Sequence, residues 1–241
     1  MFKLITTHCV VILCILSSCS AKVAPSYIKP CVGLQADCLK KTVQETLPLF
    51  AKGIPELGID SIDPLRQSHL EVTLPGNFKI QVNNGSMTGL RKCNIEHATF
   101  DNGEGDIKLF CDLTIKGLYK ANGRILIVSI NGDGNAKIKL KNASIHSKIK
   151  FEDEIRDGEV YYKVIDTNTK FSYGDKVTMD LTNLFKGNPQ LSEAVLLFLN
   201  QNWKEVVEEF GQPLVDTLID LILNNVKKFF EVVPKNELFV F

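Results

Sequence analysis

The side chains of this 241-residue chain that could do chemistry are seven cysteines, four histidines and five tyrosines. None of them falls in a recognisable catalytic pattern, because the sequence has no GxSxG elbow, no Walker loop and no HExxH motif. His69, His97 and His146 are scattered, and no CxxC or HxxxH spacing offers a metal two neighbouring ligands. We therefore expect no enzyme, no metal site and no cofactor.

The first segment of the chain predicts a secretory signal peptide over residues 1–21. Lys3 supplies a short positive start, and Val10 to Leu16 form an apolar run too short to span about 30 Å of hydrocarbon. Small residues at Cys19-Ser20-Ala21 predict cleavage at the end of this segment. A bacterial lipoprotein is the alternative, since Leu16-Ser17-Ser18-Cys19 resembles a lipid-attachment box. We expect a secreted, extracellular protein without stable membrane insertion.

Removal of that segment leaves Cys31, Cys38, Cys93 and Cys111, which can pair in three ways. A local bridge across the short loop from Cys31 to Cys38 is the simplest pairing. Cys93 and Cys111 lie on either side of the turn "DNGEGD", at a diagonal that a disulfide spans only if a bulge shifts the register. We predict the pairs Cys31–Cys38 and Cys93–Cys111, and two buried free thiols are the alternative.

Aromatic side chains are candidates for ligand contact, because they commonly line pockets and a tyrosine hydroxyl can bind a ligand's oxygen in apolar surroundings. We favour Tyr119 or Tyr162 for that polar contact. Trp203 and Phe210 are seven residues apart on one predicted helix face, where they either line a cavity or pack in an ordinary core. The predicted ligand-binding side chains are Leu47, Phe50, Phe110, Leu113, Tyr119, Ile127, Tyr162, Trp203 and Phe210.

Two helical regions must help to position these side chains. Residues 36–52 predict an amphipathic helix whose last turn Pro48 kinks or shortens. Residues 190–233 predict one long, mostly apolar helix, kinked rather than broken at Gly211-Gln212-Pro213. Such a helix should be buried on most sides, and the charges along it argue against a membrane span.

Between the helices, from about His69 to Tyr173, the apolar period is two, which predicts about six long antiparallel strands. The apolar phase slips along residues 136–151, which predicts a bulge near Asn142 to Ser144. The composite is an α+β fold: a long, strongly curved antiparallel sheet wrapped around one long C-terminal helix, with a shorter N-terminal helix. Turns are expected at Asn102-Gly103, Asn122-Gly123, Asn131-Gly132 and Asp157-Gly158.

The expected surface offers little to a charged partner. The formal net charge is zero, so we expect no nucleic-acid partner. The sequons Asn84-Gly85-Ser86 and Asn142-Ala143-Ser144 make Asn84 and Asn142 glycosylation candidates on that surface. An unidentified receptor is compatible with these features.

Five ordered segments carry a resemblance to the insect takeout and juvenile-hormone-binding proteins. The segments cover nearly all of residues 22–241, which is identified as a single takeout-like domain. They are "YIKPCVGLQADCLK", "GIPELGIDSIDPL", "IKGLYKANGRILIVSINGDGNAKIKLKN", "LTNLFKGNPQLSEAVLLFLNQNWKEVVEEFGQPL" and "VPKNELF".

The resemblance implies an elongated tubular lipid-binding fold with an apolar tunnel, and ligands such as terpenoids, fatty acids or quinone-like chains. It also implies that Cys31 and Cys38 form a bridge at one end. Two departures stand out: Ser129 replaces a proline common in relatives, and no cysteine pair follows Cys111, which favours the takeout branch over dedicated hormone carriers.

The function that follows is a carrier that encloses one elongated hydrophobic small molecule in a tunnel of about 300–1,000 Å³ or more beside the 190–233 helix. The alternative is an extracellular interaction or signalling module that shares the fold but is packed solid. For ligand entry we expect the 36–52 helix to move as a gate, with Leu47 and Phe50 at the tunnel mouth and Gly53 freeing the helix end.

Overall fold

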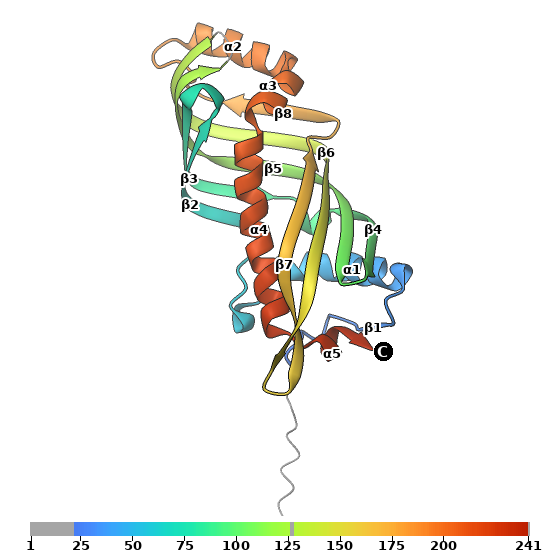
Figure 1. Cartoon of the computed structure of the whole chain (residues 1–241). Helices are drawn as coiled ribbons and strands as arrows, with labels where there is room; N and C mark the ends of the chain where they lie inside the picture. Colours follow the sequence, from blue (N-terminus) through green and yellow to red (C-terminus); the bar gives the residue numbers. More distant parts are fainter. Residues whose placement is uncertain (1–21, 126–127, 241) are drawn as a thin grey trace, which may run out of the picture.

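Two long strands form the spine of the molecule, a computed structural model that describes residues 22–125 and 128–240 (Figure 1). Strand β5 (Glu104–Ile125) and strand β6 (Val128–Arg156) pair antiparallel along almost their whole length. They are far longer than the 3–10 residues usual for strands, which accounts for the elongated shape. The predicted signal peptide and Ile127 lie outside the described residues.

Different strands complete the sheet at the two ends of this spine. At one end, β2 (Leu65–Leu74) and β3 (Phe78–Thr88) extend the sheet beyond β5, and β8 (Lys176–Leu181) extends it beyond β6. At the other end, β4 (Asn94–Asp101) lies beside β5 and β7 (Glu159–Ser172) lies beside β6. All of these pairings are antiparallel, as predicted.

A bulge joins the two ends of the sheet. Cys111 pairs with Ala143 and Leu113 pairs with Leu140, so β6 carries one extra residue there, and Asn142 has a positive φ of 56°. The bulge turns the buried face of β6 from even positions such as Leu140 to odd positions such as Ile145. The bulge predicted from the phase slip is therefore confirmed.

Two of the four expected turns are wrong. Asn102-Gly103 and Asp157-Gly158 do form tight turns with positive φ, between β4 and β5 and between β6 and β7. Asn122-Gly123 and Asn131-Gly132 instead face each other inside the β5–β6 ladder. A Cβ on Gly132 would lie 2.6 Å from the carbonyl oxygen of Leu184, so the residue marks a close backbone approach and not a turn.

The C-terminal helical region is three helices, not one kinked helix. Helix α2 (Pro189–Gln201) ends where Asn202 leaves helical geometry and its side-chain amide donates to the carbonyl of Phe198 at 2.8 Å. Helix α3 (Trp203–Phe210) and the long helix α4 (Gln212–Val232) follow. In Figure 1, α2 lies across one end of the molecule while α4 runs along the sheet. The prediction of one continuous helix over residues 190–233 was wrong. The apolar pattern continues across Asn202 and gives no sign that a helix ends there.

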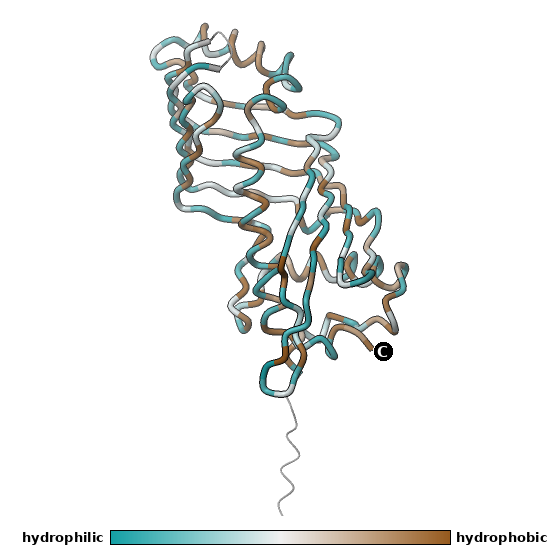
Figure 2. The backbone as a smooth tube through the Cα atoms, viewed as in Figure 1, coloured by the Kyte–Doolittle hydropathy of each residue, from teal (hydrophilic) through white to brown (hydrophobic). Residues whose placement is uncertain are grey.

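Helix α4 packs against β2 and β7, and Figure 2 shows hydrophobic stretches recurring along it. Helix α1 (Ala36–Phe50) confirms the helix predicted over residues 36–52, and it packs against β4. Short 3-10 turns η1 (Pro55–Leu57), η2 (Pro75–Asn77) and η3 (Leu90–Lys92) connect the elements. None of the described helices is both long and apolar enough to cross a membrane.

The N-terminal and C-terminal segments close the α1 end of the molecule. Strand β1 (Cys31–Val32) pairs in parallel with β9 (Phe239–Val240), which follows the short helix α5 (Lys235–Leu238). The backbone N–H groups of Val23 and Ala24 both donate to the Glu237 carboxylate, at 3.0 and 2.6 Å. The Glu237 carboxylate and the β1–β9 pair therefore hold the two segments together.

Both predicted disulfides are present. Cys31–Cys38 joins β1 to α1, with 5.8 Å between the Cα atoms. Cys93–Cys111 joins the start of β4 to β5, with 4.4 Å between the Cα atoms. A bulge between Ile95 and His97 supplies the register shift that this second bridge requires.

Candidate ligand-binding site

Two apolar cavities lie against α4. The first, which we name the α3 cavity, has a volume of about 230 Å³ and lies between α3, the first half of α4 and strands β2, β3, β5, β6 and β8. The second, the α1 cavity, has about 350 Å³ and lies between α1, β4, β5, β6, β9 and the second half of α4. Their walls consist almost entirely of aliphatic and aromatic side chains.

The two cavities are arranged in line. The α3 cavity is lined by Leu214 and Leu218, and the α1 cavity by Ile222 and Val226, which follow on successive turns of α4. Ile145 lines both cavities and therefore stands at their junction. At 1.5 Å per residue, the lining stretch of α4, from Leu214 to Phe230, is about 25 Å long. One extended hydrocarbon chain could contact both cavities.

Strand alternation builds the inner walls. Along β5 the odd-numbered residues face inward, so Ile107 and Leu109 reach the α1 cavity while Leu113 and Ile115 reach the α3 cavity. Burying apolar surface stabilises a complex by about 0.8 kcal/mol for each CH₂ group. Such walls favour a hydrocarbon and disfavour a charged or strongly hydrated ligand.

Each cavity contains one buried hydroxyl that has no hydrogen-bond partner among the described residues. These are Tyr173 Oη in the α3 cavity and Thr46 Oγ1 in the α1 cavity. Burial, with smaller effects from Asp216 and Glu208, raises the pKa of Tyr173 to about 12. The hydroxyl therefore stays neutral and keeps its proton to donate, and its oxygen lies against Gly211.

Five of the predicted ligand-binding side chains line the cavities. Leu47 and Phe50 of α1 line the α1 cavity. Leu113, Tyr119 and Phe210 line the α3 cavity. The Tyr119 hydroxyl already has a hydrogen-bond partner within the protein, since it donates to the carbonyl of Thr182 at 2.9 Å. The ring of Tyr119 is part of the wall, and the free hydroxyl is that of Tyr173.

Three others do not line either cavity. Phe110 lies on the outer face of β5, one residue out of phase with Leu109, with the Lys108 ammonium 5.2 Å from its ring centre. Trp203 packs partly buried against the core near Lys176, which is the ordinary packing alternative. Tyr162 is buried in an aromatic cluster with neighbours such as Phe151. The position of Ile127 lies outside the described residues.

Sequence reasoning missed Tyr173 and Thr46. Tyr173 follows Phe171 at the period of two, so alternation alone would have placed both on one face. Alternation does not indicate which hydroxyl lacks a hydrogen-bond partner. The Tyr119 hydroxyl finds its partner in the backbone carbonyl of Thr182, which is far away in the sequence. Both sequon asparagines, Asn84 and Asn142, are exposed.

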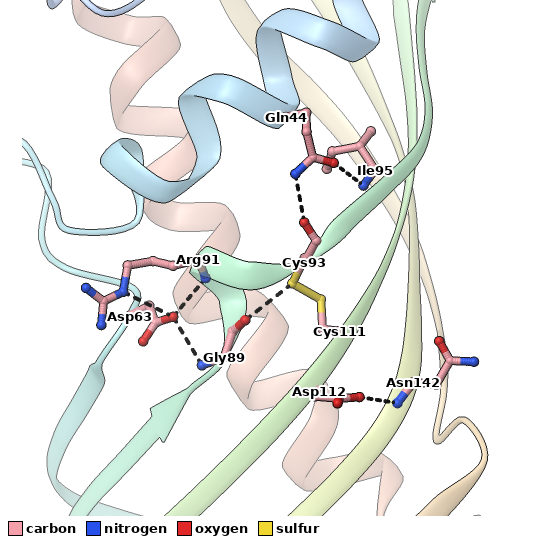
Figure 3. The surroundings of a disulfide bond; sticks show 9 residues. All are labelled: Gln44, Asp63, Gly89, Arg91, Cys93, Ile95, Cys111, Asp112 and Asn142. Atoms are coloured by element: carbon pink, nitrogen blue, oxygen red, sulfur yellow. Dashed lines mark hydrogen bonds and ion pairs between the residues drawn. A yellow bond between two sulfur atoms is a disulfide. The ribbon is translucent and has the colours of Figure 1, made fainter.

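Helix α1 is tied down more firmly than its sequence indicates (Figure 3). The Gln44 amide donates to the carbonyl of Cys93 at 3.0 Å, and the N–H of Ile95 donates to the Gln44 carbonyl at 2.8 Å. The carbonyl of Ala51, just past the helix, accepts from the N–H groups of Ile62 and Asp63, at 3.0 and 2.9 Å. The expectation that Gly53 frees the end of this helix is therefore wrong.

Two polar features lie outside the apolar cavities. A wider groove of about 870 Å³ has charged walls that include Asp60, Lys227 and Lys228, which suit no hydrocarbon. On the outer face of the sheet, His97 and His146 lie in contact although they are far apart in the sequence.

The comparisons with known proteins agree with this architecture. The model of the haemolymph juvenile hormone binding protein (JHBP) family matches residues 9–240. The chain belongs to the JHBP family. The crystal structure of Takeout 1 of Epiphyas postvittana superposes with a TM-score of 0.84 at 34% identity, covering 89% of this chain and 100% of that one. This JHBP chain is thus takeout-like, and its α+β fold is as predicted.

Two curated relatives share most of their length with this JHBP chain. The circadian clock-controlled protein daywake of Drosophila yakuba is 27% identical over 80% of this chain and 78% of its own. A protein of Schistocerca gregaria named "Putative beta-carotene-binding protein" is 23% identical over 83% of this chain and 82% of its own.

Proposed function

We propose that this JHBP-family protein is a secreted carrier that encloses one elongated apolar molecule and catalyses no reaction. The observation that carries the proposal is the pair of apolar cavities in line along α4, which meet at Ile145. A protein that acted only as an interaction module would have no use for two internal apolar cavities along one helix. The name of the Schistocerca gregaria relative, "Putative beta-carotene-binding protein", supports a long hydrocarbon ligand.

The ligand class follows from the walls and from the two free hydroxyls. An apolar chain of up to about 25 Å matches the lining stretch of α4. An oxygen on that chain would satisfy Tyr173 or Thr46, each of which costs about 1–3 kcal/mol when buried without a partner. We propose an oxygen-bearing terpenoid, fatty acid or quinone-like chain. Secretion is supported by the two disulfides and by the family's haemolymph description.

Native mass spectrometry of protein purified from insect cells tests the carrier function. We expect one apolar molecule per chain, released on denaturation and identified by lipid analysis. Delipidated protein should then bind oxygenated isoprenoids in a fluorescence displacement assay. If the delipidated protein binds no terpenoid, fatty acid or quinone, and none co-purifies, the interaction-module alternative holds instead.

A further inference from the structure

Three side chains from three neighbouring strands converge on the outer face of the sheet. The Nε2 atoms of His97 on β4 and His146 on β6 lie 2.7 and 2.8 Å from the same oxygen, Oδ1 of Asp106 on β5. The candidate ligand atoms of the three residues all lie within 4.8 Å of one another. The two rings meet edge to face, with centres 5.6 Å apart.

The strands place these side chains outward for identifiable reasons. The Ile107 side chain faces the α1 cavity, and alternation along β5 directs the neighbouring Asp106 carboxylate toward the opposite face, where it contacts His97 and His146. His146 follows Ile145, which also faces inward. The bulge between Ile95 and His97 turns two consecutive residues, Glu96 and His97, away from the interior. The bulge that aligns the Cys93–Cys111 disulfide thus also aims His97 at Asp106.

We propose that His97, Asp106 and His146 bind a divalent transition-metal ion, for which Zn²⁺ is the probe. Two imidazoles and one carboxylate suit zinc, copper, nickel or iron, whereas magnesium and calcium prefer oxygen ligands alone. Three protein ligands leave a fourth tetrahedral position to water.

The geometry needs only small movements to accept the ion. Zinc bonds of about 2.0–2.1 Å separate neighbouring ligand atoms in a tetrahedron by about 3.3 Å. The two Nε2–Oδ1 distances would therefore each widen by about half an ångström. The side chains of His97, His146 and Asp106 are 38%, 31% and 24% exposed, so an ion and its water can reach them without strand opening.

The surroundings fit a metal centre. Without an ion, both Nε2 atoms lie at hydrogen-bond distance from Asp106 Oδ1; an ion would be bound by the Nε2 lone pairs of the tautomers that are protonated at Nδ1. Glu96 Oε2 lies 3.9 Å from His97 Nδ1 and 2.7 Å from the Lys108 ammonium, so a small shift of Glu96 toward the ring would let it orient a metal-binding imidazole. Lys148 lies 3.5 Å from the other Asp106 oxygen, which leaves Oδ1 to the ion. A cluster held by hydrogen bonds alone would show no preference for such an ion.

Calorimetric titration of untagged, chelator-treated protein with Zn²⁺ tests the site. We expect one ion per chain with a micromolar or lower Kd, and weakening of about 100-fold or more in His97→Gln and in His146→Gln. His69→Gln is the matched control, because His69 lies on β2 and contacts Asn83 instead. Its binding should be unchanged.

The wild-type protein supplies a second readout that does not depend on how the variants fold. Zinc should shift the imidazole NMR signals of His97 and His146 and leave that of His69 in place, and Co²⁺ should give the visible absorption of a four-coordinate site. No binding below about 100 µM, or binding that leaves both imidazole signals unmoved, would overturn the proposal. Equal weakening by His69→Gln would do so as well.

Discussion

The α3 cavity and the α1 cavity share one helix but are closed in different ways. Five strands joined by continuous ladders, together with α3, surround the α3 cavity. Separate pieces close the α1 cavity: helix α1, the N-terminal segment around Ile28, and strand β9. These pieces are held by side-chain contacts such as those of Gln44 and Glu237.

The difference indicates which cavity opens. Breaking a ladder exposes many backbone groups at once. Swinging α1 away from β4 about its end at Ala51, whose backbone bonds stay intact, breaks the two hydrogen bonds of Gln44 and the apolar contacts of side chains such as Leu39. Each hydrogen bond contributes about 0.5–1.5 kcal/mol, so the second motion costs far less. We therefore expect ligand to enter through the α1 cavity and to reach the α3 cavity past Ile145.

Removing the two disulfides should have the largest effects on stability. The loop between Cys93 and Cys111 is 18 residues long and that between Cys31 and Cys38 is 7, so chain entropy predicts losses of about 3 and 2.5 kcal/mol. Urea unfolding of the two double Cys→Ala variants measures this. The shorter bridge ties α1 to β1, so its loss should also speed ligand exchange. Exchange that is faster only without Cys93–Cys111 would contradict the assignment of α1 as the moving element.

Ile145→Trp should separate the two cavities. The larger side chain at the junction should weaken binding of a long-chain quinone by about 100-fold, because the chain can no longer span both. A short terpenoid alcohol such as farnesol should lose about 10-fold or less. Ile155→Trp is the control, since Ile155 is 74% exposed. Equal losses for both ligands would mean that the cavities act as independent sites.

Tyr173→Phe should remove the polar contact of the α3 cavity. We expect about 10-fold weaker binding of an oxygenated isoprenoid, the worth of one hydrogen bond to a buried hydroxyl, and no change for the matching hydrocarbon. Tyr119→Phe is the control, because its hydroxyl bonds Thr182. Displacement titrations with the paired ligands measure both. If Tyr119→Phe discriminates the ligands and Tyr173→Phe does not, the assignment is reversed.

The fold could be predicted from the sequence where the signal is local and periodic. The period of two gave the strands, and the phase slip near Asn142 gave the bulge. The resemblance to a known family supplied what periodicity cannot, namely how the sheet and the helix enclose a cavity. Asn131-Gly132 was misread because a dipeptide suited to turns also permits close backbone contact, and the contact partner, Leu184, lies far along the chain.

The site was less predictable because it depends on pairings between distant segments. Leu113 and Phe210 follow from alternation and helix spacing, whereas Phe110 was placed against the phase of its own strand. Which hydroxyl is free is decided by Thr182 reaching Tyr119. The meeting of His97 with His146 depends on strand order and on a bulge that no spacing rule reveals.

Gln44→Met should have the smallest effect and tests the moving element directly. Methionine keeps the length and the packing of the side chain but removes both hydrogen bonds to the backbone of β4. The cavity walls are unchanged, so the affinity of delipidated protein should fall little, while the dissociation rate of farnesol should rise by about 5-fold. Gln81→Met is the control, since the Gln81 side chain on β3 donates to the exposed Glu71 on β2.

Hydrogen exchange gives the structural counterpart of that rate. Amides of residues 40–50 in α1 should exchange faster in Gln44→Met than in wild type, and ligand should restore their protection because it binds the closed position better. Amides of residues 215–229 in α4 should be unaffected, since that helix packs between β2 and β7. If both helices respond equally, the α1 cavity opens by a motion of the whole fold, and the contrast between the two cavities carries no kinetic consequence.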